Sequence, residues 1–451
     1  MTNVPVILTI AGSDSGGGAG IQADLKTITV LGGYGASVIT ALTAQNTCGV
    51  WAIEAPSSEF VGQQLKAVLA DLPVKAIKTG MLFSKPIIRE VGKILAEVKA
   101  PVVVDPVCVS QSGDKLLQDD AICEFFTSIF PWATLVTPNL PEAELFTGIK
   151  RPEKNYQKVG EKFFECGAKA VLLKGGHAQG KDVVDVLMLA SGQCLEFKSA
   201  RIDKKNNHGT GCTLSAAIAT YLGQGLELVE SVKKARKFLQ GALRFSYELG
   251  KGVGPVNHLF YLRKLEEKDK LRAELKAVRK ELGLLPGIGQ LIPEVRMNIV
   301  TALDFADSLE DVAGFNGRIS VTQDGELLFG QIDFGASTHM AKVLLTAREF
   351  DCKLKWAINI RYSRQIIDAI ARAGFELHWF DRKDEPEEVK QKEGSTLEWG
   401  VAKVFAENKS SQPRFIADPG EVGKEPMIRI LAENRKELLD KIKTILLALK
   451  T

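Results

Sequence analysis

The sequence lacks the features that mark secreted and membrane-spanning proteins. Its seven cysteines form no C-x-x-C pair, and their odd, scattered number indicates reduced thiols rather than a disulfide framework. No apolar run approaches about 18 residues, so we expect no transmembrane helix. The stretch Met1 to Pro5 shows no basic region leading into a long apolar core, so we expect no secretory signal. These absences predict a cytoplasmic protein without a membrane partner.

The chain also lacks an excess of one charge sign. Its 58 basic and 55 acidic residues leave a net charge of +3, and no long basic run occurs, so we expect no nucleic-acid partner. The composition, with 45% hydrophobic and 25% charged residues, is ordinary for a globular enzyme. A length of 451 residues exceeds one typical domain and predicts two or three.

The most informative motif present is a glycine-rich turn before a small apolar stretch. Gly209 and Gly211 flank Thr210, and Cys212 follows where a helix should begin. Glycine permits a positive φ and a close approach of the backbone to a ligand. The free N–H groups of the first helical turn then form an anion site, which predicts the transfer of a phosphoryl group from ATP.

Residues 4–260 alternate between short apolar runs and helical segments. This alternation predicts a mostly parallel β-sheet with helices on both faces. The predicted strands are Val6–Ile10, Ala76–Thr79, Val102–Val104, Leu135–Thr137 and Val171–Leu173. Polar or glycine residues follow each strand, and we expect them to meet at the carboxyl edge of the sheet, where ligands bind.

A helix rich in Glu and Lys at 264–282, followed by Gly283 and Pro286–Gly289, divides the chain. We predict a first domain at 1–263, a helical linker at 264–289 and a second, smaller α/β domain at 290–451. Its predicted elements are strands at Gly317–Thr322, Leu327–Phe334, Lys355–Ile360 and Glu376–Phe380, and helices at 338–350, 363–373 and 433–450.

The loop Ala11–Gly20 follows the first strand, so a dinucleotide-binding loop has to be considered. Its spacing departs from G-x-G-x-x-G, and Asp14 would repel a pyrophosphate. A loop shaped around a small polar substrate fits better. Asp24, in the following helix, is then either a helper at the substrate or a solvated helix residue.

Three further strand ends carry residues suited to phosphate chemistry. Asp105 and Glu142 suit Mg²⁺, which uses one or two carboxylates and screens a triphosphate during transfer. Lys174 suits phosphate oxygens. The alternatives are that Asn139 and Glu142 only cap a helix and that Lys174 extends its ammonium to solvent.

Seven ordered motifs together resemble the bifunctional hydroxymethylpyrimidine/phosphomethylpyrimidine kinases of thiamine biosynthesis, within the ribokinase-like superfamily. The motifs are Ala11–Asp24, Thr43–Asn46, Lys78–Leu82, Asp105–Val107, Thr137–Glu142, Leu173–His177 and His208–Thr213. Over residues 1–260 the resemblance implies a ribokinase-like fold and a homodimer. It also implies ATP- and Mg²⁺-dependent phosphorylation of 4-amino-5-hydroxymethyl-2-methylpyrimidine (HMP), first to the monophosphate and then to the diphosphate.

The resemblance also implies which residues meet the substrate. They are Gly12, Asp24, Gln45, Met81 and Val107, with Gln45 bonding the aminopyrimidine and Met81 and Val107 walling the ring. A pyridoxine-type ring is the rival substrate, because it also bears a hydroxymethyl group. Gln45 and Met81 favour the smaller pyrimidine.

On the nucleotide side, the resemblance implies contacts from Asn139, Lys174 and Thr210, a metal held by Asp105 and Glu142, and an anion hole from the amides of Gly209–Cys212. Many members of the superfamily carry Asp where Cys212 stands. A thiol at a helix N-terminus has a lowered pKa, so Cys212 is expected to accept the hydroxyl proton. The alternative is that Cys212 only packs and that positioning performs the catalysis.

Polar residues of the second domain cluster at its predicted strand ends. Arg318, His339, Asn359 and Arg361 predict a diphosphate site, because arginine forks and helix starts bind phosphates. The alternatives are ordinary salt bridges for the arginines and a helix-cap or buried role for His339.

The second domain resembles the archaeal-type thiamine-phosphate synthase domain over 290–447. Matching stretches include Ile292–Ile299, Phe334–Ala341 and Ile358–Tyr362. The resemblance implies that HMP diphosphate joins 4-methyl-5-(2-phosphoethyl)-thiazole to give thiamine phosphate and pyrophosphate. Arg318 and His339 would stabilise the leaving group. Because this domain type also occurs in regulators, a non-catalytic ligand sensor is the alternative.

Overall fold

The computed structural model describes residues 4–108, 121–390, 396–408, 411–421 and 423–451. The chain divides into two compact units, Met1–Tyr261 and Leu262–Thr451. The division falls inside one helix, α9 (Phe260–Gly283), whereas the sequence predicted a first domain ending at residue 263. In the described part of the chain, no helix has the length and apolar character needed to cross a membrane.

The first unit is built on a nine-stranded sheet in the order β3-β2-β1-β4-β5-β6-β7-β8-β9. The strands are β1 (Val6–Asp14), β2 (Tyr34–Asn46), β3 (Gly49–Glu54), β4 (Val74–Thr79), β5 (Val102–Val104), β6 (Leu135–Val136), β7 (Ala170–Leu173), β8 (Asp182–Leu189) and β9 (Cys194–Ala200). Neighbours from β2 through β7 pair in parallel, and β3, β8 and β9 add antiparallel edges. The expected mostly parallel α/β sheet is confirmed.

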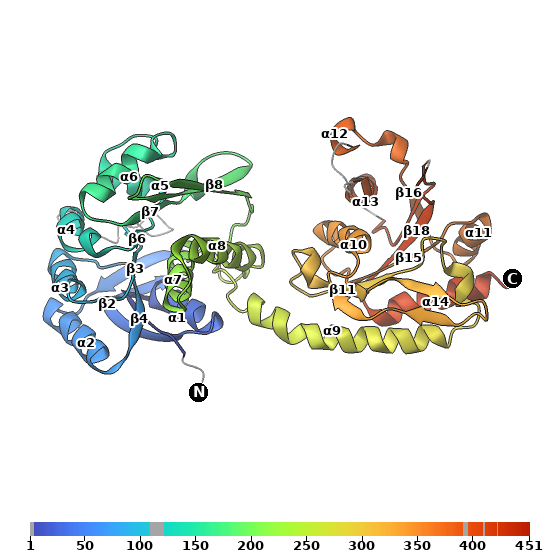
Figure 1. The fold of residues 1–451 in the computed structure, drawn as a ribbon, viewed down its shortest axis with the longest axis horizontal. Coiled ribbons are helices and arrows are strands. Elements are labelled where there is room, and N and C mark those ends of the chain that lie inside the picture. Colours follow the sequence, from blue (N-terminus) through green and yellow to red (C-terminus); the bar gives the residue numbers. More distant parts are fainter. Residues whose placement is uncertain (1–3, 109–120, 391–395, 409–410, 422) are drawn as a thin grey trace. The chain divides into compact units, whose positions relative to one another are not determined.

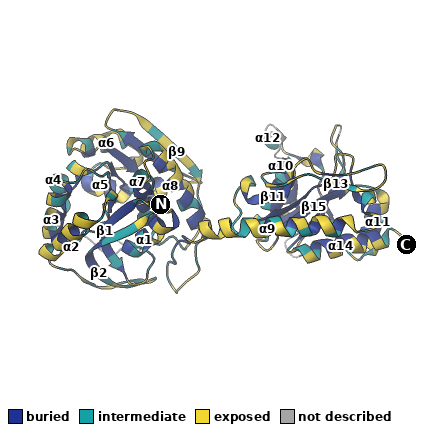
Figure 2. Cartoon of the chain, turned by 60° about the horizontal axis from the view of Figure 1, so that its bottom comes forward, coloured by how far each residue is buried: buried dark blue, intermediate teal, exposed yellow. Residues whose placement is uncertain are grey.

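Helices cover both faces of this sheet (Figure 1). One face carries α1 (Gly20–Val30), α7 (Thr210–Gly223) and α8 (Leu228–Arg244), and the other carries α2 (Ser58–Asp71), α3 (Lys85–Leu95), α4 (Ile122–Ser128), α5 (Leu140–Thr147) and α6 (Tyr156–Glu165). Strands between two helical layers are buried on both sides, which explains their unbroken apolar runs. Figure 2 shows the resulting buried centre.

The helix α9, predicted as a linker, belongs to the core of the second unit. Leu275, Val278 and Leu282 recur at helical spacing and are fully or almost fully buried beside Trp356. The opposite face of α9 is exposed (Figure 2) and carries charged residues such as Asp269, Lys276 and Lys280. The prediction of a linker is therefore corrected: α9 is a core helix, whose apolar residues alternate in the sequence with many Glu and Lys residues.

The second unit contains a seven-stranded sheet in the order β14-β11-β10-β15-β18-β17-β16. Its strands are β10 (Ile299–Ala302), β11 (Val312–Phe315), β14 (Ile332–Phe334), β15 (Trp356–Arg361), β16 (Leu377–Trp379), β17 (Phe415–Asp418) and β18 (Met427–Ala432). The pairing is antiparallel except between β16 and β17. The helices around it are α10 (Thr338–Phe350), α11 (Arg364–Arg372), α12 (Glu387–Lys390), α13 (Thr396–Glu407) and α14 (Arg435–Ala448).

One predicted strand of this unit, 327–334, is in fact two. β13 (Leu327–Phe329) pairs with β12 (Ile319–Val321) in a separate small sheet, and β14 joins the main one. Gly330 stands at the division, where a Cβ would lie 1.5 Å from the Asn316 carbonyl oxygen. The backbone approaches too closely there for any side chain, which periodicity alone does not reveal.

Candidate active site

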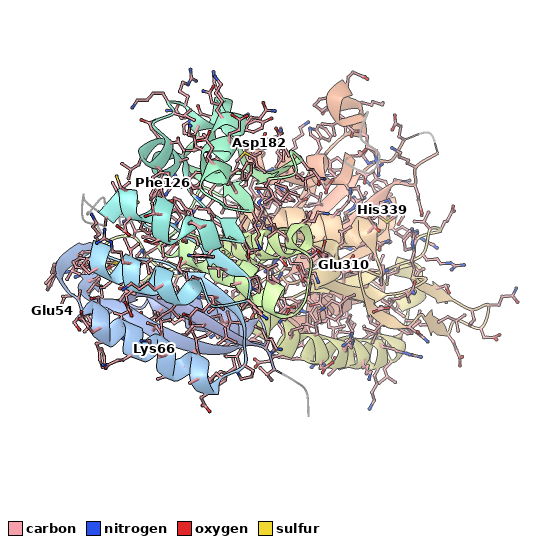
Figure 3. All side chains as sticks on the ribbon, turned by 60° about the vertical axis from the view of Figure 1, so that its left-hand side comes forward. Glu54, Lys66, Phe126, Asp182, Glu310 and His339 are labelled. Carbon is pink, nitrogen blue, oxygen red and sulfur yellow. The ribbon has the colours of Figure 1, made fainter. Side chains whose placement is uncertain are left out.

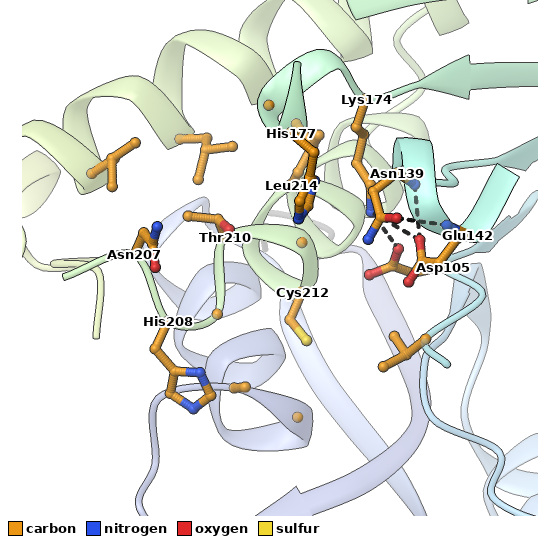
Figure 4. Close-up of a pocket in the computed structure, with 18 of the residues that line it drawn as sticks. Asp105, Asn139, Glu142, Lys174, His177, Asn207, His208, Thr210, Cys212 and Leu214 are labelled. Atoms are coloured by element: carbon orange, nitrogen blue, oxygen red, sulfur yellow. Dashed lines mark hydrogen bonds and ion pairs between the residues drawn. The ribbon is translucent and has the colours of Figure 1, made fainter. Parts of the chain in front are cut away.

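A cavity of about 420 Å³ opens at the carboxyl edge of the first sheet (Figure 4). Its wall includes Asp14 at the end of β1, Met81 after β4, Asp105 after β5, Asn139 after β6 and Lys174 after β7. The structure thus brings together residues up to 160 positions apart (14 to 174) because parallel strands deliver their ends to one edge. The volume lies in the range of small-molecule sites.

The glycine-rich turn forms the middle of this cavity. Gly209 precedes α7 with a φ of 84°, and the Thr213 N–H bonds the Gly209 carbonyl. Among the described residues, no acceptor receives the N–H groups of Gly211 and Cys212. These two amides therefore leave an uncompensated partial positive charge at the cavity wall, as an anion site requires.

Two glycine loops pack directly against each other at this turn. A Cβ on Gly209 would lie 1.9 Å from the Gly18 carbonyl oxygen, and a Cβ on Gly18 would lie 2.3 Å from the His208 ring. Asp14 Oδ2 lies 2.9 Å from His208 Nε2 and accepts from the Ala19 amide at 2.8 Å. Sequence reasoning missed this Asp14–His208 link, since the partners lie 194 positions apart.

Burial disfavours the charge on Asp14, but its hydrogen bonds with His208 and nearby amides outweigh that effect and lower its pKa. The carboxylate stays ionised at neutral pH and ties the N-terminal loop to the anion turn. Asp14 is thus a loop-fixing group rather than an obstacle to a phosphate.

Lys174, Asp105, Asn139 and Glu142 gather on one side of the turn (Figure 4). Lys174 Nζ lies 2.8 Å from Asp105 Oδ1 and 4.0 Å from Glu142 Oε2. Asn139 and Glu142 form a complete capping box at the start of α5, so the predicted capping alternative is present as a structural fact. Glu142 also lines the cavity, and burial, reinforced by the Asp105 charge, raises its pKa to about 7.

The remaining predicted substrate residues line one end of the cavity, except for Asp24. Gly12, Gln45, Met81 and Val107 are all in the wall. A Cβ on Gly12 would lie 3.0 Å from Met81 Sδ, so the absence of a side chain at Gly12 leaves the space that the Met81 side chain occupies. Gln45 Nε2 lies 3.2 Å from His208 Nε2, which links the substrate end to the anion turn.

Asp24 is fully buried and does not belong to the cavity wall. Its Oδ2 accepts from Lys78 Nζ at 2.7 Å and from Thr9 Oγ1 at 2.6 Å. The structure therefore does not place this carboxylate at the substrate. The solvated alternative is wrong because Asp24 is fully buried, and its absence from the cavity wall gives no support to a direct substrate contact.

The expected lowering of the Cys212 pKa is wrong. The thiol is partly exposed to the cavity but surrounded by protein, and burial raises its pKa to about 11 despite the opposing charge of Lys78. Removal from water disfavours a thiolate more strongly than the helix terminus favours it.

The other end of the cavity is lined by residues that sequence reasoning did not select. Arg236 on α8 donates to Asp185 Oδ2 at 2.7 Å, and Asp185 Oδ1 accepts from the Gly175 amide at 2.7 Å. Gly175 directly follows Lys174, so the ion pair holds the segment that presents the lysine. The sequence signal that could have identified this pair is Asp185 itself, a charged residue at a buried position of the apolar strand β8.

Replacing Asp185 with alanine is expected to lower the free energy of unfolding of the first unit by about 3–5 kcal/mol, because Arg236 would keep a nearly buried charge without its carboxylate partner. Denaturant unfolding followed by fluorescence measures the change. Asp182→Ala on the same strand is the control: its pair with Lys198 is exposed, and its loss should stay below about 1 kcal/mol. Equal losses in both variants would contradict the prediction.

In the second unit, Arg318 and His339 lie close enough for the charge of the arginine to act on the imidazole. His339 lies in the first turn of α10 (Figure 3) and is an exposed residue, but its partial burial together with the charges of Arg318, Lys342, Arg429 and Arg382 lowers its pKa. Arg318 has a φ of 68° and donates to the Val295 carbonyl. His339 is thus neutral at pH 7 and faces a surplus of cations.

Asn359 and Arg361 are instead tied to the main chain. The Asn359 amide is almost completely buried and bonds the Asn298 N–H at 2.7 Å and the Arg296 carbonyl at 3.1 Å. Arg361 Nε donates to the Ile292 carbonyl at 2.9 Å. These bonds show that both residues hold the segment 292–298, and their contact with a substrate stays a prediction.

A buried charge cluster near His339 was not predicted. Asp418 accepts from Arg382 at 2.8 Å and from Arg429 at 2.7 Å, so two arginines share one carboxylate. Arg429 lies in the middle of the apolar strand β18 and is almost completely buried. A charge inside an apolar run was the available signal, because such a charge needs a nearby partner.

Sequence comparisons match each unit to a family. The phosphomethylpyrimidine kinase family matches residues 14–257, and the thiamine-phosphate synthase ThiN family matches residues 274–444. A thiamine biosynthesis bifunctional protein ThiED of Geobacter sulfurreducens is 50% identical over 256 residues, covering 56% of this chain and 52% of that protein. The chain thus spans about half the length of that relative. A hydroxymethylpyrimidine/phosphomethylpyrimidine kinase of Rhizobium meliloti is 48% identical over 257 residues, covering 56% of this chain and 96% of that protein.

Two solved structures share the fold of the first unit. The Bacillus subtilis pyridoxal kinase in an ADP complex has a TM-score of 0.53 and 33% identity, covering 57% of this chain and 98% of that one. The Staphylococcus aureus pyridoxal kinase with AMP-PCP and pyridoxal has a TM-score of 0.53 and 32% identity, covering 58% and 95%.

Proposed function

Because this chain belongs to the phosphomethylpyrimidine kinase family and carries a ThiN-type thiamine-phosphate synthase domain, we propose that it performs successive steps of thiamine biosynthesis. The first unit phosphorylates HMP to its monophosphate and then to its diphosphate with ATP. The second unit joins that diphosphate to the thiazole phosphate and releases pyrophosphate. A cytoplasmic location and a homodimer belong to the same proposal, and light scattering of the purified protein tests the latter.

The observation that carries the kinase proposal is the composition of one cavity. A ring wall of Met81 and Val107, the amides of Gly211 and Cys212, which have no acceptor in the described part of the chain, and the ammonium of Lys174 line the same space. An alcohol held at the ring wall would face a phosphoryl group held by the amides and Lys174. Positioning and charge stabilisation of this kind are the main demands of phosphoryl transfer.

The donor set of the cavity fits Mg²⁺. Among the described residues no cluster of three metal-binding side chains occurs, but Mg²⁺ in kinases needs only one or two carboxylates beside phosphate oxygens and waters. Asp105 and Glu142 provide two buried carboxyl groups, and the ammonium of Lys174 lies 2.8 Å from the first and 4.0 Å from the second. They would hold the ion, which when bound screens the charge of the triphosphate.

In the second unit, the cation surplus around His339 supports a site for a phosphorylated substrate. We assign Arg318 and the neutral imidazole N–H of His339 to the leaving pyrophosphate. Asn359 and Arg361 contribute by holding the segment before Met297 rather than by a direct contact.

The proposal is tested by incubating the full chain with HMP, ATP, Mg²⁺ and the thiazole phosphate. Mass spectrometry is expected to detect HMP phosphate, then HMP diphosphate, and finally thiamine phosphate with pyrophosphate. Accumulation of HMP diphosphate without thiamine phosphate would remove the synthase activity and favour the sensor alternative. A lack of any phosphorylated pyrimidine would remove the kinase activity.

A second candidate substrate is a pyridoxine-type ring, because the two solved structures named above are pyridoxal kinases. The family match and the 48–50% identical relatives favour the pyrimidine. Measuring kcat/KM for HMP and for pyridoxine decides between them, with HMP expected to be favoured about tenfold or more.

A further inference from the structure

Arg318, which is assigned above to the leaving pyrophosphate, is bonded to a neighbouring turn of the chain. Its guanidinium donates to the Val295 carbonyl, and both residues are exposed. A guanidinium carries five N–H donors, so one bond to a carbonyl orients it without using the donors that a phosphate needs. The place of the Arg318 guanidinium therefore depends on the place of the Val295 carbonyl.

Val295 lies in a β-turn whose two central amides donate to one carboxylate. The turn runs from Pro293 to Arg296, and the Arg296 N–H donates to the Pro293 carbonyl at 2.9 Å. Glu425 Oε1 accepts from the Glu294 N–H and Oε2 accepts from the Val295 N–H, each at 2.9 Å. The bonds from β15 described above hold the two ends of this segment, whereas the carboxylate holds its middle.

Two arginines beside this turn have a strained backbone. Arg296 has a φ of 71° and Arg318 a φ of 68°, a left-handed conformation that persists in such residues only where surrounding contacts enforce it. The two arginines flank the bridge between Met297 and Ile319, whose main chains exchange hydrogen bonds of 3.0 and 2.7 Å. Arg296 Nη1 also donates to the Gly317 carbonyl at 3.4 Å, so each arginine bonds the carbonyl directly before the other.

Stability alone does not account for the carboxylate at this turn. Glu294, Val295 and Arg296 are exposed, so water would satisfy the amides of the turn without a protein partner. Glu425 is only half-buried, and because water competes for its hydrogen bonds, they contribute little to folding. What the carboxylate adds is a fixed position for Val295 and, through its carbonyl, for Arg318.

The connection that carries Glu425 is anchored at the buried charge cluster near His339. It begins at Asp418, which pairs with the two arginines described above and accepts from the Gly420 amide at 3.0 Å. A Cβ on Gly420 would lie 2.5 Å from the Lys424 carbonyl oxygen, so the two ends of the connection pack closely together. The carboxylate that holds the turn is therefore itself held by a closely packed part of the second unit.

We propose that Glu425 is a positioning residue of the synthase, which fixes the guanidinium of Arg318 for the leaving pyrophosphate by holding the turn at Val295. The proposal rests on the proposed synthase function and deepens it. In the reaction, the thiazole nitrogen forms a C–N bond, and the C–O bond of HMP diphosphate breaks with its electron pair going to pyrophosphate. A guanidinium that is already in place stabilises this charge without reorganisation.

A double-mutant cycle on the full chain tests this indirect role, with thiamine phosphate formation measured from added HMP diphosphate and thiazole phosphate. Glu425→Ala is expected to lower kcat about tenfold and Arg318→Ala about 100-fold, because a misplaced donor costs less than a missing one. The double variant should match Arg318→Ala within about twofold, since no guanidinium remains to be positioned. A native kcat in Glu425→Ala, or a further tenfold loss in the double variant, would overturn the proposal.

The matched control is another carboxylate that holds a backbone amide of the second unit. Glu437 Oε2 accepts from the Glu433 N–H at 2.7 Å just after β18, whereas Glu425 stands before that strand. Glu437→Ala should keep the synthase kcat within about twofold of the native value. A tenfold loss in this variant as well would overturn the proposal, because general loosening of the second unit would then explain both results.

If circular dichroism shows that Glu425→Ala does not fold, Glu425→Gln takes its place in the cycle. The glutamine keeps one acceptor oxygen, so one of the two amides stays bonded and we expect a loss of kcat of about threefold. The double variant with Arg318→Ala should again show no further loss. An additive loss would overturn the proposal in this form too.

A second readout separates positioning at the leaving group from an effect on the other substrate. In Glu425→Ala the KM for the thiazole phosphate should change less than about twofold while kcat falls. A raised KM with a native kcat would overturn the proposal. If the native protein forms no thiamine phosphate from HMP diphosphate, the proposed synthase function fails; if it does and the cycle is additive, only the role of Glu425 fails.

Discussion

Replacing Gly209 with alanine is expected to lower the kinase kcat by roughly 100- to 1,000-fold, the range seen when an oxyanion-site donor is lost. Gly209 has a φ of 84°, which an alanine adopts only with strain, and its Cβ would lie 1.9 Å from the Gly18 carbonyl oxygen. Either the turn or the N-terminal loop must move. The turn and the loop both line the cavity, so a shift of either one moves the amides of Gly211 and Cys212 out of alignment. A coupled assay of ADP release with HMP measures the effect.

Gly225→Ala is the matched control for this variant. Gly225 follows the opposite end of α7 with a φ of 87°, and nothing lies within 4 Å of its virtual Cβ. The backbone strain is therefore similar, but no clash occurs and the cavity is not touched. We expect a stability loss of about 1–2 kcal/mol and a kcat within about twofold of the native value. A similar collapse of kcat in both variants would show that strain, and not the contact between the two loops, is responsible.

Replacing His339 with alanine is expected to lower thiamine phosphate formation by roughly 100-fold while HMP diphosphate still forms at the native rate. The low pKa of His339, caused by burial and the surrounding cations, leaves an imidazole that is neutral at pH 7 but retains one N–H donor. In the alanine variant, the leaving pyrophosphate lacks this hydrogen-bond donor. Product formation from added HMP diphosphate and thiazole phosphate measures the synthase step alone.

Arg364→Ala is the control in the second unit. Arg364 is an exposed cation at the start of α11 that pairs with Asp368 on the next turn, so its loss should leave both activities unchanged. Native turnover in His339→Ala would favour the sensor alternative. A fall in kinase activity in the same variant would indicate general loss of folding rather than loss of a donor.

The convergence of the site residues in the first unit was predictable because it follows from topology. Asp105, Asn139 and Lys174 each follow an apolar strand, and parallel strands between helices present such residues at one edge. The turn at Gly209 was recognisable for a local reason, since only glycine suits a positive φ beside a closely packed backbone.

The charge state of Cys212 was not predictable in the same way. The helix start that favours a thiolate is visible in the sequence, whereas the burial that opposes it depends on what packs around the sulfur. The burial of Asp24 was not predicted for a related reason. Its partner Lys78 is 54 residues away and reaches it because α1 packs on β1, the strand that pairs with β4 in the folded sheet.

The second unit illustrates the limits of periodicity. α9 was expected as a linker because its charged residues dominate the pattern, yet Leu275, Val278 and Leu282 place it in the core. The strands β10, β11, β17 and β18 and the helix α13 were not predicted. Short strands in an antiparallel sheet take their identity from cross-strand partners, which are far away in the sequence.

By itself, the sequence determined the parallel sheet of the first unit, the anion turn and the resemblance of each unit to a family, because these depend on local periodicity and on residues at required positions. Only the tertiary structure decided the protonation of Cys212, the burial of Asp24 against Lys78, the Asp14–His208 link and the cation cluster around His339. Those features depend on distances between residues remote in the chain, and electrostatic energies in a protein interior are set by such distances and by exclusion of water.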